Sequence, residues 1–284
     1  RSLVGSEMCI RDRYTAVYDS NTILITKASA KDTFKKEIHF LRNTFPQSKS
    51  MFLRRIAYWI TRPYFKNKKI WIMYDKLYKG GDSSEYLYRF CKGNNDGITR
   101  YYIIDKNTPD YHKLKKDGMK PLKNHSLKHK MAFLNADIIL ITNSNTFPFN
   151  GYSMEYSRFI RGFCNFSTMC LQHGLTVQKC AMAQQRIVDN TKRYFIASKY
   201  EYNNLMHHAY GYKGFDYVRL TGIGRYDGLV SNDQKQILLS PTWRMYNAMP
   251  VTTSEGEQRA YNPDFKNTVY YKIYNDLINN EKLI

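Results

Sequence analysis

The sequence predicts an α/β fold built on a parallel sheet with helices on both sides. From residue 70 onward, short runs rich in β-branched and aromatic residues alternate with segments whose apolar residues recur at helical spacing. Such alternation is typical of parallel strands joined by helical crossovers. The chain has 284 residues, 43% of them hydrophobic, which is enough for a proper core in one large domain or two modest ones.

The expected elements follow from this pattern. The strands are predicted at Ile70–Tyr74, Arg100–Ile104, Asp137–Thr142, Thr168–Leu171, Arg193–Ala197, Tyr217–Thr221 and Gln236–Ser240. The helices between them are predicted at Ser84–Lys92, Pro109–Asp117, Ser126–Asn135 and Tyr200–Tyr210. Ligands of such sheets bind beyond the carboxyl ends of the strands, so the residues that follow each strand are the candidates for chemistry.

A lead-in precedes the sheet at residues 14–65, with a strand expected at Asn21–Lys27 and a helix at Ala30–Arg42. Residues 51–65 predict a basic amphipathic helix that Pro63 ends. One face carries Phe52, Ile56, Trp59 and Ile60, and the charges are Arg54, Arg55 and Arg62. This helix either lies in a membrane interface or packs on the domain with its arginines in water. The lysine-rich run 66–69 favours the membrane, because it attracts anionic headgroups.

The ends of the chain predict an internal piece of a longer protein. Residues 1–13 resemble a non-native, adapter-derived segment, and they have neither a signal-peptide core nor a helical period. The last residues stop within a helical pattern that has no stop signal. We therefore expect an N-terminal Rossmann-like domain at 66–228 and the incomplete start of a second domain at 236–284.

Charge and composition narrow the function classes. The formal net charge is +20, which attracts polyanions, although AT-rich coding explains such a composition equally well. The five cysteines form no CxxC pair and are odd in number, so neither a disulfide framework nor a zinc site is indicated. No apolar run approaches the roughly 18 residues that span a bilayer. The sequence also lacks P-loop, HExxH and GxSxG motifs.

Polar residues follow most of the predicted strands. His173 is the main candidate, because imidazole is the side chain best able to accept a proton near neutral pH, and Gly174 lets a ligand approach the backbone. Arg244 follows the seventh strand, where a guanidinium suits bidentate contact with phosphate. A structural role stays open for each residue. His173 could instead be a buried histidine bonded to a backbone carbonyl, and Arg244 could form a surface salt bridge. Other candidates at strand ends are Asp75, Asn143, Arg225, Asp227 and Thr242.

Together these segments resemble the CDP-glycerol glycerophosphotransferase family of teichoic acid and capsule polymerases and primases, over about residues 66–250. The matching pieces stand in family order: Trp71–Asp75 with Glu85, Tyr101–Asp105, Ser126–Lys130 leading to Ala136-Asp137, Gln172-His173-Gly174 with Lys179, Ser198, Thr221–Asp227 and Ser240–Arg244. The sequence departs from the family at Gln172, which is often aromatic there, and at Leu175–Thr176, where proline is common.

The resemblance implies a GT-B-like architecture of two Rossmann-like domains, the C-terminal one truncated here. It makes His173 the catalytic base and Arg244 a donor-site residue, and it places Ser198, Arg225 and Asp227 at the substrate. The implied reaction transfers glycerol phosphate from CDP-glycerol to the hydroxyl end of a lipid-linked polymer and releases CMP, at the cytoplasmic face of the bacterial membrane. The resemblance makes no cofactor certain and leaves a divalent cation open.

Three other readings compete with this one. The first keeps the family and changes the donor to CDP-ribitol, and the second is a nucleotide-sugar glycosyltransferase of the same architecture. The third is a basic nucleic-acid-binding protein, which the charge and the 25 tyrosines would suit. It is the least favoured, because no RNP-like or helix-turn-helix pattern appears and the polar strand ends would have no role.

Overall fold

The structure is a computed structural model. It describes residues 14–19, 22–27, 29–142, 152, 157–164, 166–175, 184–188, 190–232, 235, 238–241, 244, 247 and 261–282. The chain divides into two compact units, Arg1–Val230 and Ser231–Ile284. The domain boundaries predicted from the sequence stay predictions.

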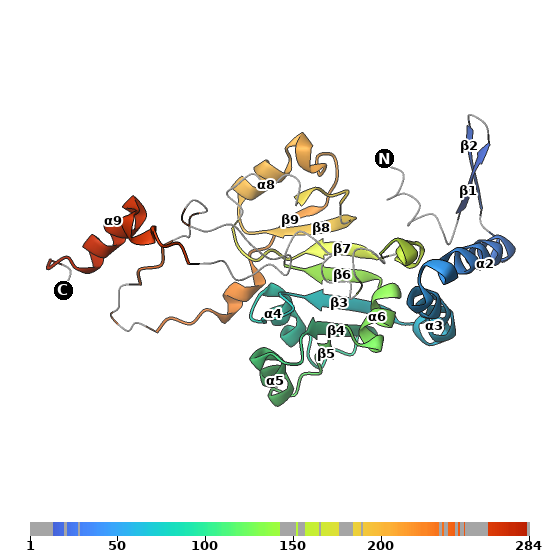
Figure 1. Ribbon diagram of the computed structural model, residues 1–284, viewed down its shortest axis with the longest axis horizontal. Coiled ribbons are helices and arrows are strands. Elements are labelled where there is room, and N and C mark those ends of the chain that lie inside the picture. The colour runs from blue at the N-terminus through green and yellow to red at the C-terminus, as the bar shows by residue number, and fades with distance from the viewer. Residues whose placement is uncertain are drawn as a thin grey trace. The chain divides into compact units, whose positions relative to one another are not determined.

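A seven-stranded sheet forms the centre of the first unit, and all of its strands are parallel (Figure 1). Its strands are β3 Lys69–Tyr74, β4 Ile98–Ile104, β5 Leu122–Lys123, β6 Ile138–Ile141, β7 Ser167–Cys170, β8 Thr191–Ile196 and β9 Val218–Leu220. This sheet confirms the α/β prediction and six of its seven strands. The two-residue edge strand β5 was not predicted, because so short a segment has no periodicity of its own.

Helices cover both faces of this sheet, as predicted. They are α4 Ser83–Phe90, α5 Pro109–Lys116, α6 Leu127–Leu134 and α8 Lys199–Leu205, with 3-10 turns η4 His208–Tyr210 and η5 Gly224–Gly228. Ile70, Ile72 and Tyr74 pack in one cluster with α6, whereas Met73 packs in a second cluster with Tyr88 of α4. Alternate residues of one strand thus enter opposite layers, as the period of two requires.

The strand order places a switch point at the middle of the sheet. The order is β5-β4-β3-β6-β7-β8-β9, so the chain builds outward from β3 to one edge and then returns to add β6 on the other side. At such a point the connections leave β3 and β6 in opposite directions, and the carboxyl ends of the two strands border a crevice. Asp75 and Thr142 directly follow these two strands.

An antiparallel ribbon and a helical hairpin precede the sheet. They comprise β1 Tyr14–Asp19, β2 Thr22–Lys27, α2 Ala30–Gln47 and α3 Lys49–Phe65. The strand predicted at Asn21–Lys27 and the two helices are confirmed, and β1 is its unpredicted partner. Pro63 does not end α3 as predicted: it lies in the last turn, and the Lys66 N–H still bonds the Arg62 carbonyl at 2.8 Å. Proline has no N–H, so α3 lacks the hydrogen bond that residue 63 would donate but keeps the one that Lys66 donates.

Arg55 differs from the alternative that packs α3 on the domain with its arginines in water. Its guanidinium is buried, and it forms a two-pronged ion pair with Glu37 of α2, with Nε–Oε1 and Nη2–Oε2 distances of 2.8 and 2.6 Å. It also donates to the carbonyl of Phe159 and lies over the Phe163 ring. A buried guanidinium needs such partners, so Arg55 joins the hairpin to the η2–η3 segment, Ser157–Phe159 and Arg161–Phe163.

The second unit holds η7 Phe265–Asn267 and α9 Val269–Ile278. Residues 238–240 have no strand, so the part of the predicted strand Gln236–Ser240 that the structure describes is not confirmed. Side chains of α9 such as Val269 and Ile273 are exposed, and none of its residues is buried. The second Rossmann-like domain of the GT-B prediction therefore stays a prediction.

Candidate active site

His173 lies just beyond β7, at the edge where the parallel strands end. Its side chain is exposed, and its Nδ1 lies 3.2 Å from the backbone carbonyl oxygen of Thr142, which follows β6. A carbonyl only accepts hydrogen bonds, so this contact requires the proton on Nδ1. In the neutral ring, Nε2 is then the nitrogen with the lone pair, which is the atom that a general base uses to accept a proton.

The residue before His173 has an uncommon backbone. Gln172 has φ 59°, a left-handed conformation that a residue with a side chain adopts at a cost. Its side chain is buried and donates from Nε2 to the Tyr194 hydroxyl of β8 at 3.0 Å. This hydrogen bond anchors the residue before His173 to the neighbouring strand.

Arg225 of η5 lies beside the His173-Gly174 turn. A Cβ added at Gly174 would stand 3.7 Å from Nη2 of Arg225, so the guanidinium borders this glycine. The Nη1 atom lies 3.8 Å from Oδ1 of Asp82, the N-cap of α4. The pair is long and partly exposed, so Asp82 restrains the guanidinium without saturating its donors. The turn that carries His173 thus has a cation beside its glycine.

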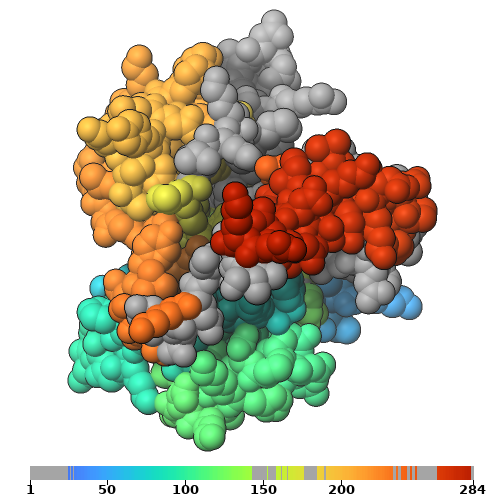
Figure 2. Space-filling view, turned by 90° about the vertical axis from the view of Figure 1, so that its left-hand side faces the viewer, coloured from blue at the N-terminus to red at the C-terminus, as the bar shows by residue number. Residues whose placement is uncertain are grey.

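Close packing of η5 on α4 fixes the position of Arg225 (Figure 2, orange against turquoise). A Cβ at Gly228 would overlap the ring of Tyr86, and one at Gly224 would touch Ser83. Glycine at 228 is therefore required by a close approach to an aromatic ring. Because η5 rests on α4 and α4 follows β3, Arg225 is placed at the same edge of the sheet as His173.

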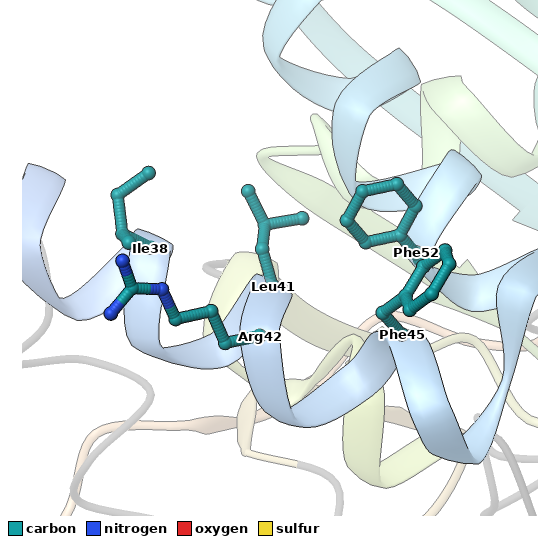
Figure 3. Close-up of a pocket in the computed structure, with 5 residues that line it drawn as sticks. All are labelled: Ile38, Leu41, Arg42, Phe45 and Phe52. Carbon is teal, nitrogen blue, oxygen red and sulfur yellow. The ribbon is translucent and has the colours of Figure 1, made fainter.

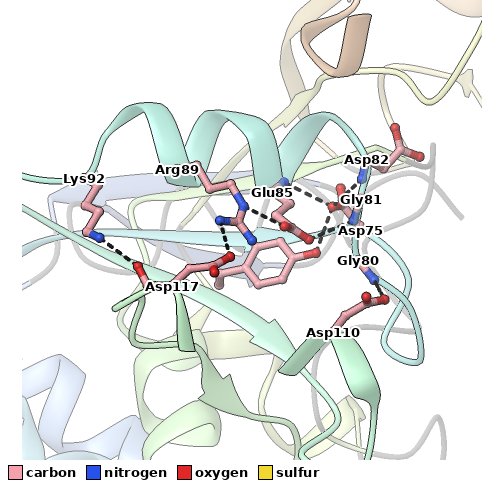
Figure 4. Close-up of polar contacts among 10 residues, drawn as sticks. Asp75, Gly80, Gly81, Asp82, Glu85, Arg89, Lys92, Asp110 and Asp117 are labelled. Carbon is pink, nitrogen blue, oxygen red and sulfur yellow. Dashed lines mark hydrogen bonds and ion pairs between the residues drawn. The ribbon is translucent and has the colours of Figure 1, made fainter. Parts of the chain in front are cut away.

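Asp75 organises the loop between β3 and α4 (Figure 4). It is buried, and its two oxygens accept hydrogen bonds from the backbone N–H groups of residues 82, 84 and 85 and from the hydroxyl of Tyr102 at 2.8 Å. Burial raises the pKa of Asp75 to about 6, while the hydrogen bond from Tyr102 opposes that rise. These contacts make Asp75 a structural anchor of the loop rather than a free ligand group.

The N–H groups at the start of α4 are also taken. Besides the bonds to Asp75, the N–H of Ser83 donates to Asp82, that of Gly81 to Glu85 and that of Gly80 to Asp110. A helix N-terminus usually attracts anions, but here carboxylates of the protein occupy it. An anionic ligand at this edge would therefore depend on Arg225 and on the turn at His173.

Comparison with known proteins assigns the chain to a family. The family model for "CDP-Glycerol:Poly(glycerophosphate) glycerophosphotransferase" matches residues 55–283. The chain belongs to this glycerophosphotransferase family. The match runs from the buried arginine of α3 to the end of the second unit, so it includes the whole seven-stranded sheet and every site residue discussed above.

The chain is also similar to a curated protein and, more distantly, to solved structures. The chain is 31% identical over 284 residues to the minor teichoic acid biosynthesis protein GgaB of Bacillus subtilis (strain 168), which covers 95% of this chain and 31% of GgaB. It thus spans about a third of that relative. Structures of the wall teichoic acid polymerase TagF, one soaked with CDPG, match at 14% identity with TM-scores of 0.42 and 0.44. They cover 69% of this chain and 49% and 48% of TagF.

The remaining predicted site residues of this family member have separate places. Ser198 is the N-cap of α8, and its hydroxyl accepts the Glu201 N–H at 3.2 Å, which is a structural use. Asp227 is exposed on η5. Arg244 is exposed and belongs to the second unit, so its predicted pairing with His173 across a groove stays a prediction. Asn143, Lys179 and Thr242 lie outside the described residues.

Sequence reasoning missed the groups that position the candidate site. Thr142 matters through its backbone carbonyl, which no side-chain pattern reveals. Asp82 restrains Arg225, and its place before Ser83-Ser84 at a helix start is a capping signal that could have found it. Among the residues described, no group of three or more His, Cys, Asp or Glu side chains is arranged to hold a metal ion.

Proposed function

We propose that the protein transfers a polyol phosphate, glycerol phosphate in the first instance, from a CDP-activated donor to the hydroxyl end of a surface polymer. The observation that carries the proposal is the exposed His173, whose Nδ1 is bonded to a carbonyl and whose neighbour Gly174 is bordered by Arg225. Membership of the glycerophosphotransferase family supplies the reaction class. The GgaB and TagF names place relatives in teichoic acid synthesis, in agreement with this class.

The reaction is a displacement at phosphorus. The acceptor hydroxyl loses its proton to Nε2 of His173, and its oxygen attacks the donor phosphorus that carries the glycerol. The bond between this phosphorus and the bridging pyrophosphate oxygen breaks, and CMP leaves with the electron pair. Proton removal and in-line positioning account for much of the rate in such reactions.

The phosphates are negatively charged and need cations as partners. We assign one arginine to the acceptor polymer and another to the donor. Arg225 borders Gly174, the residue after His173, and would hold the last phosphodiester of the polymer, so that the terminal hydroxyl meets the imidazole. Arg244 would contact the pyrophosphate of the donor, as the resemblance implies. A guanidinium suits both contacts because it can give two parallel hydrogen bonds to phosphate oxygens.

The test is a donor assay on the full-length protein with an oligomeric glycerol phosphate acceptor. Phosphorus NMR follows the loss of CDP-glycerol, the appearance of CMP and the formation of a new phosphodiester. The proposal expects all three in equal amounts. CDP-ribitol is supplied in parallel to identify the donor. Release of CMP without a new phosphodiester, or no turnover of either donor, would contradict transfer.

We further propose that the α2–α3 hairpin holds the protein on the cytoplasmic face of an anionic membrane. Apolar side chains are exposed along both helices, among them Phe34, Phe45, Leu53 and Ile60, the last at 74%. Ile38, Leu41, Phe45 and Phe52 line an open groove of about 500 Å³, with Arg42 beside it (Figure 3). Basic residues of this hairpin and of the run that follows it would meet the headgroups. None of the helices in the described part of the chain is long and apolar enough to cross a bilayer.

Vesicle sedimentation tests the membrane proposal. Ile60→Glu should weaken binding to vesicles that contain phosphatidylglycerol by about tenfold or more, because a charge replaces an apolar contact with lipid. Ile187→Glu is the matched control, since Ile187 is comparably exposed, at 66%, in the connection before β8. Equal binding of both variants, at wild-type level, would refute a role of the hairpin.

A further inference from the structure

The three residues that follow β7 bond to the strands on both sides of it. The first, Leu171, donates its N–H to the carbonyl of the last residue of β6 at 2.7 Å. The second, Gln172, bonds to the other side, where its Nε2 donates to the Tyr194 hydroxyl of β8 at 3.0 Å. The third, His173, returns to the β6 side through the contact of its Nδ1 with the carbonyl that follows β6. The turn that carries the imidazole is thus held between two strands.

The backbone of Gln172 is strained. Its φ of 59° lies in the left-handed region, where a residue with a side chain has a higher free energy than glycine. Such a conformation persists only where the surrounding structure holds it, and strained residues of this kind gather at functional sites. Gln172 directly precedes the candidate base. A contact that stabilises this conformation therefore bears on the position of His173.

The hydrogen bond to Tyr194 is a contact that can hold this conformation. Both side chains are buried, with Gln172 3% and Tyr194 1% exposed. Tyr194 pairs with Cys170 in the sheet, and the two side chains share one core cluster, so the hydroxyl lies in the layer that Gln172 enters. A return of Gln172 to the right-handed region would withdraw its amide from this partner, and a buried amide without a partner is costly. The buried bond and the left-handed backbone therefore stabilise each other.

The imidazole itself is held less firmly than the residue before it. His173 is exposed, and its Nδ1 contact of 3.2 Å is at the long end of the range for hydrogen bonds. Water can replace the partner of an exposed group at little cost, so a small movement of the backbone would free the ring to take the other tautomer. The backbone at residue 172 therefore influences how often Nε2 is the nitrogen with the lone pair.

We propose that Gln172 is a positioning residue, which keeps the His173 imidazole in its Nδ1–H tautomer through the buried hydrogen bond to Tyr194. Its role is indirect: it holds the backbone from the β8 side, while the Thr142 carbonyl holds the ring from the β6 side. The consequence for turnover rests on the proposed transfer reaction. The effect on the imidazole does not, and the two are measured separately.

Nitrogen NMR of the full chain, without any donor, tests the effect on the imidazole. The His173 signals are assigned by their loss in His173→Ala, and their shifts in the neutral ring report which nitrogen carries the proton. Wild type should show the Nδ1–H tautomer. Tyr194→Phe removes one oxygen atom and should shift the tautomer ratio toward Nε2–H about five- to tenfold, because one buried hydrogen bond is lost.

Tyr210→Phe is the matched control, because it makes the same chemical change in the same cluster. Tyr210 is buried, with 2% exposed, and its hydroxyl accepts from Nδ2 of Asn204 in α8 at 3.5 Å. This variant should keep the wild-type tautomer of His173. If Tyr194→Phe and Tyr210→Phe both show the wild-type tautomer ratio, or both shift it equally, the positioning role of the Gln172 bond is overturned.

Two changes at residue 172 separate the side chain from the backbone. Gln172→Met keeps the length of the side chain and removes the amide, whereas Gln172→Gly removes the strain together with the amide. Both should shift the tautomer ratio as Tyr194→Phe does, and Gln172→Met combined with Tyr194→Phe should shift it no further. A wild-type ratio in Gln172→Gly would overturn the role of the hydrogen bond, because the backbone conformation alone would then suffice. If a variant at residue 172 does not fold, Tyr194→Phe decides.

Kinetics of the full-length protein then connect the tautomer to turnover. Tyr194→Phe should lower kcat about five- to tenfold and leave the Kd of CDP-glycerol unchanged, because the base is misplaced while no donor contact is lost. Tyr210→Phe should keep both values. A shifted tautomer ratio with an unchanged kcat would overturn the positioning role in catalysis. A wild-type protein that turns over neither CDP-glycerol nor CDP-ribitol contradicts the transfer proposal instead, and the tautomer measurement then decides the inference alone.

Discussion

Nδ1 of His173 lies 3.2 Å from the carbonyl oxygen of Thr142, and this contact joins the ends of two neighbouring parallel strands. It fixes the tautomer of an exposed imidazole at the switch point of the sheet. The mechanism proposed above depends on this contact, because only the Nδ1–H tautomer leaves Nε2 free to take a proton from an acceptor.

Arg225 is expected to act on the acceptor. Arg225→Met should lower kcat/KM for the polymer acceptor about 10- to 100-fold, because a charged hydrogen bond to phosphate is lost, while the Kd of the CDP donor stays unchanged. Arg219→Met is the control, since Arg219 lies on β9 and pairs with exposed Asp216. A loss of donor affinity in Arg225→Met would instead place Arg225 at the donor.

Asp75 should make stability depend on pH. Its pKa in the folded protein, about 6, lies above the usual 3.8, so the folded state holds the proton more tightly than the unfolded state. Protonated Asp75 therefore stabilises the folded state by up to about 3 kcal/mol below about pH 4. This stabilisation is lost as the pH rises through about 6. The difference between the denaturant unfolding of wild type and of Asp75→Asn, measured from pH 4 to 7, checks this.

The same Asp75→Asn variant should be less stable than wild type at pH 5, by about 1–3 kcal/mol. An amide has one acceptor oxygen, and its NH₂ group would face the N–H groups that now donate to the carboxylate. Equal stability of the two proteins, with the same pH dependence, would show that the carboxylate does not anchor the loop.

Gly228 should be intolerant of a side chain. In Gly228→Ala the new Cβ overlaps the ring of Tyr86, so η5 must move away from α4. We expect a stability loss of about 1–3 kcal/mol and a fall in acceptor kcat/KM, because Arg225 moves with η5. Gly228→Ala combined with Tyr86→Ala should recover part of both. If the double variant is worse than Gly228→Ala alone, the clash is not the cause.

The buried ion pair between Arg55 and Glu37 should behave as a unit. Arg55→Met leaves a buried carboxylate unpaired and should lower the free energy of unfolding by about 3–5 kcal/mol, as measured with urea. Replacing Glu37 by Met as well should restore most of that loss. Two single-variant losses that simply add in the double variant would mean that the residues are not coupled.

The sequence predicted the sheet well because its strands are apolar runs separated by helices, and burial on both faces keeps that pattern simple. It predicted His173 from chemistry and position together. It could not predict the burial of Arg55, because the Glu37 partner is 18 residues away and only the folded hairpin brings them together. The face of α3 that packs inward is Met51, Arg55 and Tyr58, whereas Trp59 and Ile60 of the predicted apolar face are exposed.

Asp75 shows a different limit. A polar residue at the end of a strand reads equally well as a ligand group or as a loop anchor, and only the four donors around it decide between the two. Ser198 is similar, because its hydroxyl caps α8. The role of Thr142 depends on a backbone carbonyl and could not be read from residue types at all.

The central claim is that His173 is the base of the transfer reaction. The most direct measurement is CMP release from CDP-glycerol with an acceptor present, compared between full-length His173→Ala, wild type and His208→Ala, a histidine on η4 away from the strand ends. The account predicts that His173→Ala binds CDP-glycerol with wild-type affinity but loses at least about 100-fold in kcat, and that His208→Ala is normal. Turnover of His173→Ala within a few-fold of wild type would contradict it.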